Sequence, residues 1–320
     1  MSKPNRKRIF YFCPDFPQPS GGIKKIYRHV ERLNELGLNA AVVHQKSGFR
    51  VDWHTHQVPI VWLEDKPQFD ASDTWAIPEV MTELIRQTSR SPVHRILLAM
   101  SWTPTYSRLK PGERWQDHGV TRAITTSAVI ADHFAWSMDL DVTIIPEFVN
   151  PELYYPEEKS DLSICYLTRK DQSGAWLQGV ISRRTDRLAA INWVPLREMD
   201  EPTYATRMRQ ASVYLATTLQ EGMHVSVLEA MACGALVIGY SGIGGSEYMI
   251  GDGPNQNCVL VENGNLLALG QRVEEVLTEL VESPDRYAQV VENGVKTAAR
   301  YQNRQAEVEA LRAFYNTAIL

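Results

Sequence analysis

Short apolar runs alternate with amphipathic stretches along the first half of the chain. The run Arg8–Cys13 predicts a buried strand, and Ile23–Leu36 predicts a helix because apolar residues recur every three or four positions. After the helix stop at Gly37, Asn39–His44 predicts the next strand. The same alternation continues with helix Pro78–Arg90, strand Arg95–Met100, strand Arg122–Thr125, helix Ser127–Ser137 and strand Val142–Ile145. This order is typical of βαβ units with a parallel sheet.

The second half repeats the alternation after a stretch rich in proline and glutamate, Asn150–Ser160, which we interpret as an interdomain linker. From Leu266 the pattern is helical to the end, with breaks expected near Ser283-Pro284 and at Gly294. The elements predicted between linker and tail are strand Leu162–Leu167, helix Ala175–Arg184, strand Leu188–Val194, helix Pro202–Gln210, strand Val213–Ala216, strand Ala235–Ile238 and strand Cys258–Val261. The chain therefore reads as an α/β protein with two Rossmann-like parallel-sheet domains.

Composition narrows the classes of function. A chain of 320 residues can fold two domains, each with its own core, and the net charge of −5 argues against a protein that binds nucleic acid through its phosphates. The four cysteines are far apart, form no CxxC and have no zinc-site spacing, so we expect reduced thiols in a cytosolic protein. No run approaches the ~20 apolar residues of a membrane span, and the expected location is the cytoplasm.

The most informative stretch holds two glutamates eight positions apart, Glu221 and Glu229. The apolar spacing of Val225 and Leu228 predicts a short helix, and Gly234 supplies its stop. We expect Gly222 to Val225 to form the first helical turn, where backbone N–H groups lack partners and the helix dipole attracts phosphate. Two carboxylates flanking such a turn would suit a ligand with hydroxyls at both ends and phosphate in the middle, such as a nucleotide-sugar.

This stretch resembles the donor half-site of retaining glycosyltransferases of the family-4 type (glycosyl transferases group 1), which have the GT-B fold. The resemblance extends to Thr143–Pro156, which is similar to the segment leaving the first domain, and to Gly21-Gly22, which is similar to the glycine loop after the first strand. It implies two Rossmann-like domains facing a cleft. The implied division is residues 1–155 for the acceptor, 156–303 for the donor and a helix 304–320 that returns to the first domain.

The resemblance also assigns roles. Glu221 would meet the donor sugar, and Glu229 would hold the ribose hydroxyls. The other donor-binding residues implied are Gly21, Gly22, Gly222, Met223, His224 and Val225. No metal is implied, since relatives leave the pyrophosphate to cations and a helix dipole, and no cofactor is implied beyond the nucleotide-sugar substrate.

The cations that grip the diphosphate depart from the family pattern. Relatives have Gly-Arg after the strand matching Leu162–Leu167, then Lys-Gly further on. Here Thr168 replaces the glycine, and Ser173-Gly174-Ala175 stands at the expected lysine. Arg169 matches the family arginine, and Lys170 is the first substitute for the lysine. Arg183 or Arg184 would be the second.

Relatives also carry a histidine after the strand matching Arg95–Met100, where this chain has Ser101-Trp102-Thr103. Ser101 and Trp102 are therefore acceptor-side candidates, and His44 and His118 are possible stand-ins for the histidine. The pair Asp139 and Asp141 mimics a DxD metal motif, but it precedes a strand instead of following one, so we interpret it as a turn.

The acceptor side offers two further hypotheses. We interpret the segment Gln45–Ile77, which is rich in tryptophan and histidine, as irregular, and Trp53 and Trp62 in it are candidates for stacking on a sugar. The helix after Gly22 has a basic face, which is either solvated or a peripheral membrane contact with a lipid-linked acceptor. This face consists of Lys24, Lys25, Arg28 and Arg32.

The function predicted is transfer of a hexose from a nucleotide diphosphate sugar to a hydroxyl of a glycan, a lipid-linked acceptor or a small molecule, with retention. The main alternative is a catalytically degenerate GT-B domain that binds nucleotide or assembles with a partner. A sugar epimerase or a phosphorylase on the same fold is the second alternative. An NAD dehydrogenase is disfavoured because the GxGxxG fingerprint is absent.

Overall fold

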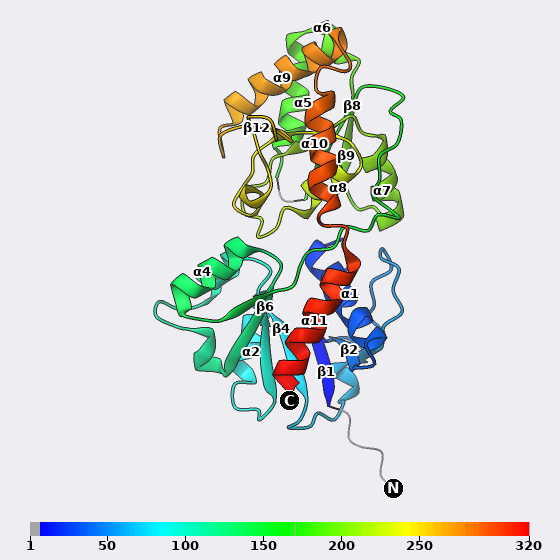
Figure 1. Cartoon of the computed structure of the whole chain (residues 1–320). Helices are drawn as coiled ribbons and strands as arrows, with labels where there is room; N and C mark the ends of the chain where they lie inside the picture. The colour runs from blue at the N-terminus through cyan, green and yellow to red at the C-terminus, as the bar shows by residue number, and fades with distance from the viewer. Residues whose placement is uncertain (1–6, 170, 320) are drawn as a thin grey trace. The chain divides into compact units, whose positions relative to one another are not determined.

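The structure is a computed structural model that describes residues 7–169 and 171–319 (Figure 1). The chain forms two compact units. The N-terminal unit comprises Met1–Glu147 and Arg304–Leu320, and the C-terminal unit comprises Phe148–Asn303. No helix within the described ranges combines the length and apolar character needed to cross a bilayer.

The N-terminal unit is built on a parallel seven-stranded sheet of order β3-β2-β1-β4-β5-β6-β7. Its strands are β1 (Arg8–Phe12), β2 (Asn39–His44), β3 (Ile60–Trp62), β4 (Thr74–Pro78), β5 (His94–Leu98), β6 (Val120–Thr125) and β7 (Val142–Ile144). Its α-helices are α1 (Gly21–Glu35), α2 (Thr82–Gln87), α3 (Thr103–Arg108), α4 (Ala128–Met138) and α11 (Arg304–Ile319).

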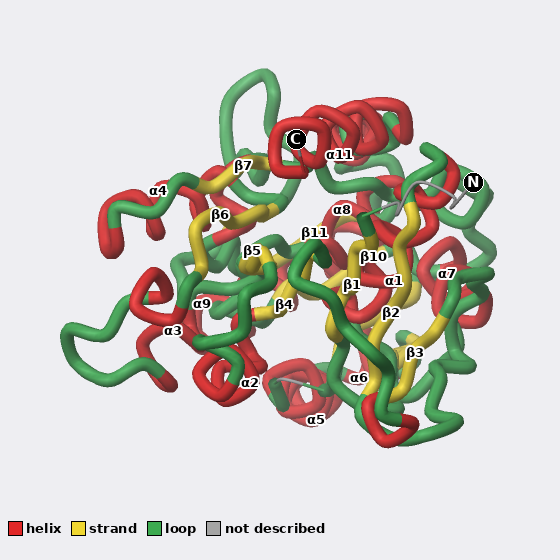
Figure 2. The backbone as a smooth tube through the Cα atoms, turned by 90° about the horizontal axis from the view of Figure 1, so that it is seen from below, coloured by secondary structure: helices red, strands yellow, loops and turns green. Residues whose placement is uncertain are grey.

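Both faces of this sheet are covered, as a parallel sheet requires. Successive side chains of a strand point to opposite faces, so Ile9 and Tyr11 of β1 pack with residues of α1 and α11. Phe10 and Phe12 pack with residues of α2 and α4 on the other face. Figure 2 shows α11 and α2 on opposite sides of the strands. The core therefore has two layers, one on each side of the sheet.

The segment predicted to be irregular, Gln45–Ile77, contains two strands. β4 lies at the centre of the sheet, where it pairs with β1 and β5. Its residues are buried on both faces, so its sequence shows no alternation of apolar and polar positions that would have revealed it. The predicted helix Pro78–Arg90 is also shorter than expected: a 3₁₀ turn, Glu79–Met81, precedes α2.

The C-terminal unit has a parallel five-stranded sheet of order β12-β11-β10-β8-β9. Its strands are β8 (Ser163–Leu167), β9 (Asn192–Leu196), β10 (Val213–Ala216), β11 (Leu236–Gly239) and β12 (Val259–Leu260). Its α-helices are α5 (Ser173–Arg184), α6 (Asp186–Ala189), α7 (Glu201–Gln210), α8 (Val225–Ala232), α9 (Leu266–Glu282) and α10 (Ala288–Ala299).

Two predictions for the C-terminal unit outside the candidate site were wrong. The strand expected at Leu188–Val194 begins only at Asn192, because Leu188 lies in α6 and fills the core. Gly294 does not break a helix but lies inside α10, where a Cβ atom would be 3.4 Å from the carbonyl oxygen of Asn257 and from Met231 of α8. The glycine therefore allows α10 to pack closely on α8.

Three of the four residues on the basic face of α1 are neither solvated nor open to a membrane. Lys25, Arg28 and Arg32 are each only 8% exposed, because they pair with acids inside the N-terminal unit. The guanidinium of Arg28 donates to Glu147 at 2.6 Å and to Glu307 at 2.7 Å. The expectation of a solvated or lipid-binding face was therefore wrong for these three residues. A row of basic side chains on a helix can form ion pairs with buried acids as well as face solvent.

Glu147 and Glu307 occupy the two points where the chain passes between the units. Glu147 is the last residue of the first segment of the N-terminal unit, and Glu307 lies in the first turn of α11. Burial alone would raise the pKa of Glu147, but Lys25 and Arg28 together hold it well below its usual range. Glu147 is therefore ionised at neutral pH, and its charge depends on the cations of α1 for compensation.

A second buried acid, Glu79, follows the carboxyl end of β4 and is 1% exposed. Burial raises its pKa to about 7, although backbone amides of Met100 and Ser101 oppose the shift. Within the described residues, its Oε2 atom has no hydrogen-bond partner. A carboxyl group held in this way is partly protonated at neutral pH.

Replacing Arg28 with methionine should destabilise the protein by about 3–5 kcal/mol, because two buried carboxylates lose their shared cation. Urea unfolding of the wild type and the Arg28→Met variant would measure the free energy of unfolding. Arg187→Met is the matched control, since Arg187 and Glu282 form an exposed pair and its loss should cost less than about 1 kcal/mol. Equal stability of the two variants would contradict the role assigned to Arg28.

Replacing Glu79 with glutamine should stabilise the protein more at pH 8 than at pH 5. A carboxyl whose folded pKa of about 7 exceeds its ordinary value of 4.5 costs stability as pH rises through this window, because folding disfavours the charged form. Glutamine cannot ionise, so the variant escapes this cost. Urea unfolding at both pH values is the measurement. Glu83→Gln is the control, since this side chain is 71% exposed, and an equal pH effect in both variants would contradict the prediction.

Candidate active site

The C-terminal sheet has one point where its strand order reverses. From β8 the chain crosses to β9 on one side, and then to β10 on the other side of β8. In open α/β sheets, ligands bind beyond the carboxyl ends of the strands at such a reversal. Arg169 follows β8 there, and the loop containing Glu221 follows β10. Arg169 and Glu221, both predicted from the sequence, therefore follow the two strands that flank the reversal, where the strand order favours ligand binding.

The helix after Glu221 begins later than predicted. α8 starts at Val225, so Gly222, Met223 and His224 form a loop instead of the first helical turn. The amide of Val225 donates to the carbonyl oxygen of Met223 at 2.9 Å, and this local turn prevents an earlier helix start. These three loop residues are buried, whereas Val225 itself is partly exposed.

Two glycine-containing loops pack directly against each other at this edge. The amide of Gly244, in the turn after β11, donates to the carbonyl oxygen of Glu221 at 3.0 Å. A Cβ atom on Gly244 would lie 2.4 Å from the carbonyl oxygen of Gly222, which no side chain could tolerate. The glycine turn therefore fixes the backbone that carries Glu221, whose side chain is half-buried.

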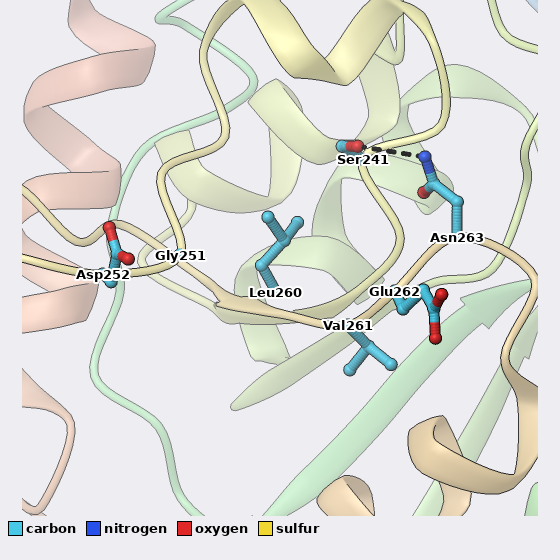
Figure 3. Close-up of a pocket in the computed structure, with 7 residues that line it drawn as sticks. All are labelled: Ser241, Gly251, Asp252, Leu260, Val261, Glu262 and Asn263. Atoms are coloured by element: carbon cyan, nitrogen blue, oxygen red, sulfur yellow. Dashed lines mark hydrogen bonds between the residues drawn. The ribbon is translucent and has the colours of Figure 1, made fainter.

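Beside this turn lies a hollow of about 390 Å³ at the carboxyl ends of β11 and β12 (Figure 3). Asn263 lines it and joins the two loops, because its side-chain oxygen accepts from the amide of Gly242 at 3.0 Å. Its side-chain nitrogen lies 3.5 Å from Ser241 Oγ, the contact drawn as a dashed line in Figure 3. Asn263 thus lines the hollow and at the same time holds the glycine turn in place.

His224 is 1% exposed and points into the interior of its loop. Its Nε2 atom lies 2.9 Å from the hydroxyl of Thr218, and its carbonyl oxygen accepts from the hydroxyl of Tyr248 at 2.7 Å. The side chain therefore supports the loop from within.

Glu229 lies one helical turn after Val225, on the same face of α8, and is 5% exposed. The hydroxyl of Tyr204 in α7 donates to Glu229 Oε2 at 3.1 Å. Burial raises the pKa of Tyr154 and of Tyr204, and the nearby charge of Glu229 raises both further. Glu229 is therefore a buried carboxylate among tyrosines. Nothing in the spacing of the sequence pointed to Tyr204, which comes from another helix.

Arg169 is exposed directly after β8, as a cation for a diphosphate should be, while Lys170 lies outside the described residues. Arg183 and Arg184 cannot replace the missing lysine. They end α5, a 12-residue helix, so they lie roughly 16 Å along its axis from the end near β8. Gly174 cannot be replaced by a lysine either, because a Cβ atom there would be 2.2 Å from the ring of Tyr166.

In the N-terminal unit, Gly21 and Gly22 are the first residues of α1 rather than part of a loop. A Cβ atom on Gly22 would lie 2.9 Å from the sulfur of Met100, so the helix begins close to the end of β5. The strand order of this sheet reverses between β1 and β4, and Glu79 follows β4 at that point. Sequence analysis missed Glu79 because it missed the strand that carries it.

The acceptor-side candidates fall into two groups. Ser101 and Trp102 follow the carboxyl end of β5 and are partly exposed. Trp53 is 8% exposed and its ring packs in the core of the N-terminal unit, so the expectation that it offers a face to a sugar was wrong. Trp62 is half-buried, and its indole donates to the carbonyl oxygen of Phe49 at 2.8 Å.

The two histidines considered as stand-ins for the family histidine are each held by neighbouring side chains. His44 is fully buried between the hydroxyl of Tyr27 at 2.7 Å and Asp15 at 3.0 Å. His118 lies before β6, at the amino edge of the sheet, and contacts Glu113 at 2.7 Å. His44 lies at the carboxyl end of β2 but is closed off from solvent, and His118 lies at the opposite edge, so neither ring is an open group at the carboxyl edge of the sheet.

The Asp139 and Asp141 pair also lies before a strand, β7, and Asp139 caps α4 with a positive φ of 53°. Within the described residues, no group of three or more His, Cys, Asp or Glu side chains could hold a metal ion. The pair lies in the short connection between α4 and β7.

Residues 165–279 match the family described as glycosyl transferases group 1. Over 96% of this chain and 94% of the relative, the chain is 24% identical to an alpha-1,6-glucosyltransferase of Actinobacillus pleuropneumoniae serotype 7 (strain AP76). This match spans nearly the whole of both proteins.

Among solved structures, sucrose-phosphate synthase of Thermosynechococcus elongatus aligns with a TM-score of 0.70 at 13% identity, covering 98% of this chain and 99% of the other. The Anabaena protein Alr3699/HepE in complex with UDP-glucose aligns with a TM-score of 0.68 at 12% identity, covering 97% and 99%. The two parallel sheets and these alignments establish the GT-B fold, and the segment that matches glycosyl transferases group 1 lies within the C-terminal unit of that fold.

Proposed function

We propose that this protein transfers a hexose, glucose in the first instance, from a UDP-sugar to a hydroxyl of an acceptor with retention of configuration. The observation that carries the proposal is the pair Glu221 and Glu229 beside the reversal point of the C-terminal sheet. The choice of UDP and glucose is supported by the Anabaena protein solved with UDP-glucose and by the alpha-1,6-glucosyltransferase relative.

The donor would bind across the loop and helix that join the two glutamates. Glu229 would accept hydrogen bonds from the ribose hydroxyls, and Tyr204 would orient its carboxylate. The diphosphate would meet the partly exposed first turn of α8 at Val225 and the exposed guanidinium of Arg169. Glu221 would orient the hydroxyls of the sugar, because the contact with Gly244 fixes its backbone.

Transfer would break the bond between sugar C1 and the diphosphate oxygen while the acceptor oxygen bonds to C1 on the same face. The acceptor proton would pass to the departing phosphate oxygen, so no protein side chain would form a covalent intermediate. The contribution of the protein would be positioning and stabilisation of the developing negative charge. Arg169 and the dipole of α8 would supply that stabilisation without a metal ion.

The alternative of a nucleotide-binding domain without turnover has one specific observation in its favour. The family lysine is absent from the start of α5, and packing of Gly174 against Tyr166 would exclude a lysine at that position. Arg169 would then carry the charge of the leaving group with less help than in relatives. Binding of UDP without transfer to any acceptor would support this alternative.

The purified protein should convert UDP-glucose and a glucose-containing acceptor into an α-linked product, because retention preserves the α configuration of the donor. Proton NMR of the product would report the anomeric coupling, and release of UDP would report turnover. Addition of EDTA should leave the rate unchanged. A β-linked product would contradict retention, and UDP binding without product from a broad set of acceptors would favour the domain without turnover.

Glu229→Ala should weaken UDP binding roughly 10- to 100-fold, since a hydrogen bond to a charged group contributes about 1.5–3 kcal/mol. Tyr204→Phe should have a smaller effect, because it leaves the carboxylate in place. Calorimetric titration with UDP, GDP, ADP and dTDP would measure the affinities. Glu282→Ala, a change of an exposed acid in α9, is the control. Unchanged affinity in a folded Glu229→Ala protein would contradict the assigned role.

A further inference from the structure

A row of aromatic rings joins α3 and α4 on the N-terminal unit. The ring centroids of Trp102 and Tyr106 are 6.0 Å apart, those of Tyr106 and His133 are 4.9 Å apart, and those of His133 and Trp136 are 6.3 Å apart. We name these four residues the aromatic track. Two of the four are well exposed, since Tyr106 is 54% exposed and Trp136 is 80% exposed.

The track begins at the edge of the sheet where ligands are expected. Trp102 follows the carboxyl end of β5, while Trp136 lies near the end of α4. The core does not require Trp136, because the inner face of α4 already packs against the sheet through Ile130, Phe134 and Met138. An exposed tryptophan on the opposite face adds little to folding, and together with exposed Tyr106 in the same row of rings it forms an apolar patch of the kind that marks a binding surface.

The polar groups around the track narrow the chemistry of that ligand. Asp132 is exposed and precedes Trp136 by one helical turn, so the two side chains share a face. The helix α4 contains no lysine or arginine, and burial lowers the pKa of His133, which keeps this ring neutral at neutral pH. The surface therefore combines aromatic faces with a carboxylate acceptor and lacks cations on α4.

A neutral oligosaccharide fits this combination. Its C–H faces can stack on aromatic rings, and its hydroxyls can donate to a carboxylate. An anionic lipid surface fits less well, because surface-bound helices use lysine and arginine on their polar face. Arg108, the cation on α3, already donates to the carbonyl oxygen of Val80.

We propose that the aromatic track binds the neutral oligosaccharide part of an extended acceptor, with the reacting end toward Trp102 and the remote sugars toward Trp136. This inference rests on the proposed function and deepens it, because it makes the acceptor a glycan chain rather than a single sugar or a lipid head group. Binding of remote sugars would raise the efficiency of transfer without touching the reacting atoms.

The test compares wild type, Trp136→Ala and Trp176→Ala with glucose and with α-1,6-linked glucose oligomers of increasing length. Trp176 is the matched control, since it is 57% exposed on α5 of the C-terminal unit. The wild type and Trp176→Ala should show kcat/KM rising with acceptor length. Trp136→Ala should lose about tenfold for long oligomers through KM and should match the wild type with glucose.

Binding without the donor separates this inference from the proposed function. The oligomers should quench the tryptophan fluorescence of the wild type, and Trp136→Ala should bind them more weakly. If this result holds but no nucleotide-sugar supports transfer, the track stands and the proposed function fails. Equal length dependence in all three proteins would overturn the track. Loss of binding to phosphatidylglycerol vesicles in Trp136→Ala, with no oligomer binding by the wild type, would overturn it in favour of a lipid surface.

Discussion

The shared guanidinium of Arg28 is the contact on which the N-terminal unit depends. It bonds Glu147, where the chain leaves this unit, and Glu307, where the chain returns to it. Both acids are almost fully buried, so each is tolerable only while a cation neutralises it. Arg28 therefore couples the packing of α1 to both ends of the crossing.

Other contacts of the helix that carries Arg28 reach the carboxyl edge of the sheet and the neighbouring helix α11. The helix α1 starts at Gly21, and Lys25 donates to the hydroxyl of Thr126 after β6 at 2.8 Å. On the same face, α11 packs against α1, and the hydroxyl of Tyr315 donates to that of Tyr11 at 2.8 Å. The ion network thus holds α1 against the sheet and α11, and the first turn of the same helix brings Gly22 close to Met100.

The local pattern of the sequence predicted the elements that bury only one face. The helix α1 appeared because Ile23, Ile26, Val30 and Leu33 follow helical spacing, and all four are buried. The strand β4 escaped detection because both of its faces are buried and its neighbours are rich in aromatic residues. Fold recognition succeeded because the glutamate pair and its glycine turn form one local motif.

The candidate site was predictable only where its parts are close in sequence. Glu221 and Glu229 were found by spacing, whereas Tyr204, the partner of Glu229, comes from α7. The start of α8 was wrong because a turn at Met223, rather than helix propensity, decides it. Tertiary contacts such as these have no local signature, so Glu79 was also missed.

The two units differ in how their candidate sites are built, and this difference explains where the family is recognisable. The proposed donor side consists of loops packed so closely that Gly244 admits no side chain, around a buried carboxylate. Few sequences satisfy such backbone constraints, and the family match, residues 165–279, lies entirely in this unit. The proposed acceptor side consists of exposed rings such as Tyr106 and Trp136, which a sequence can exchange without disturbing the core. Under the proposed function, specificity for the acceptor can therefore change while the proposed donor site stays constant.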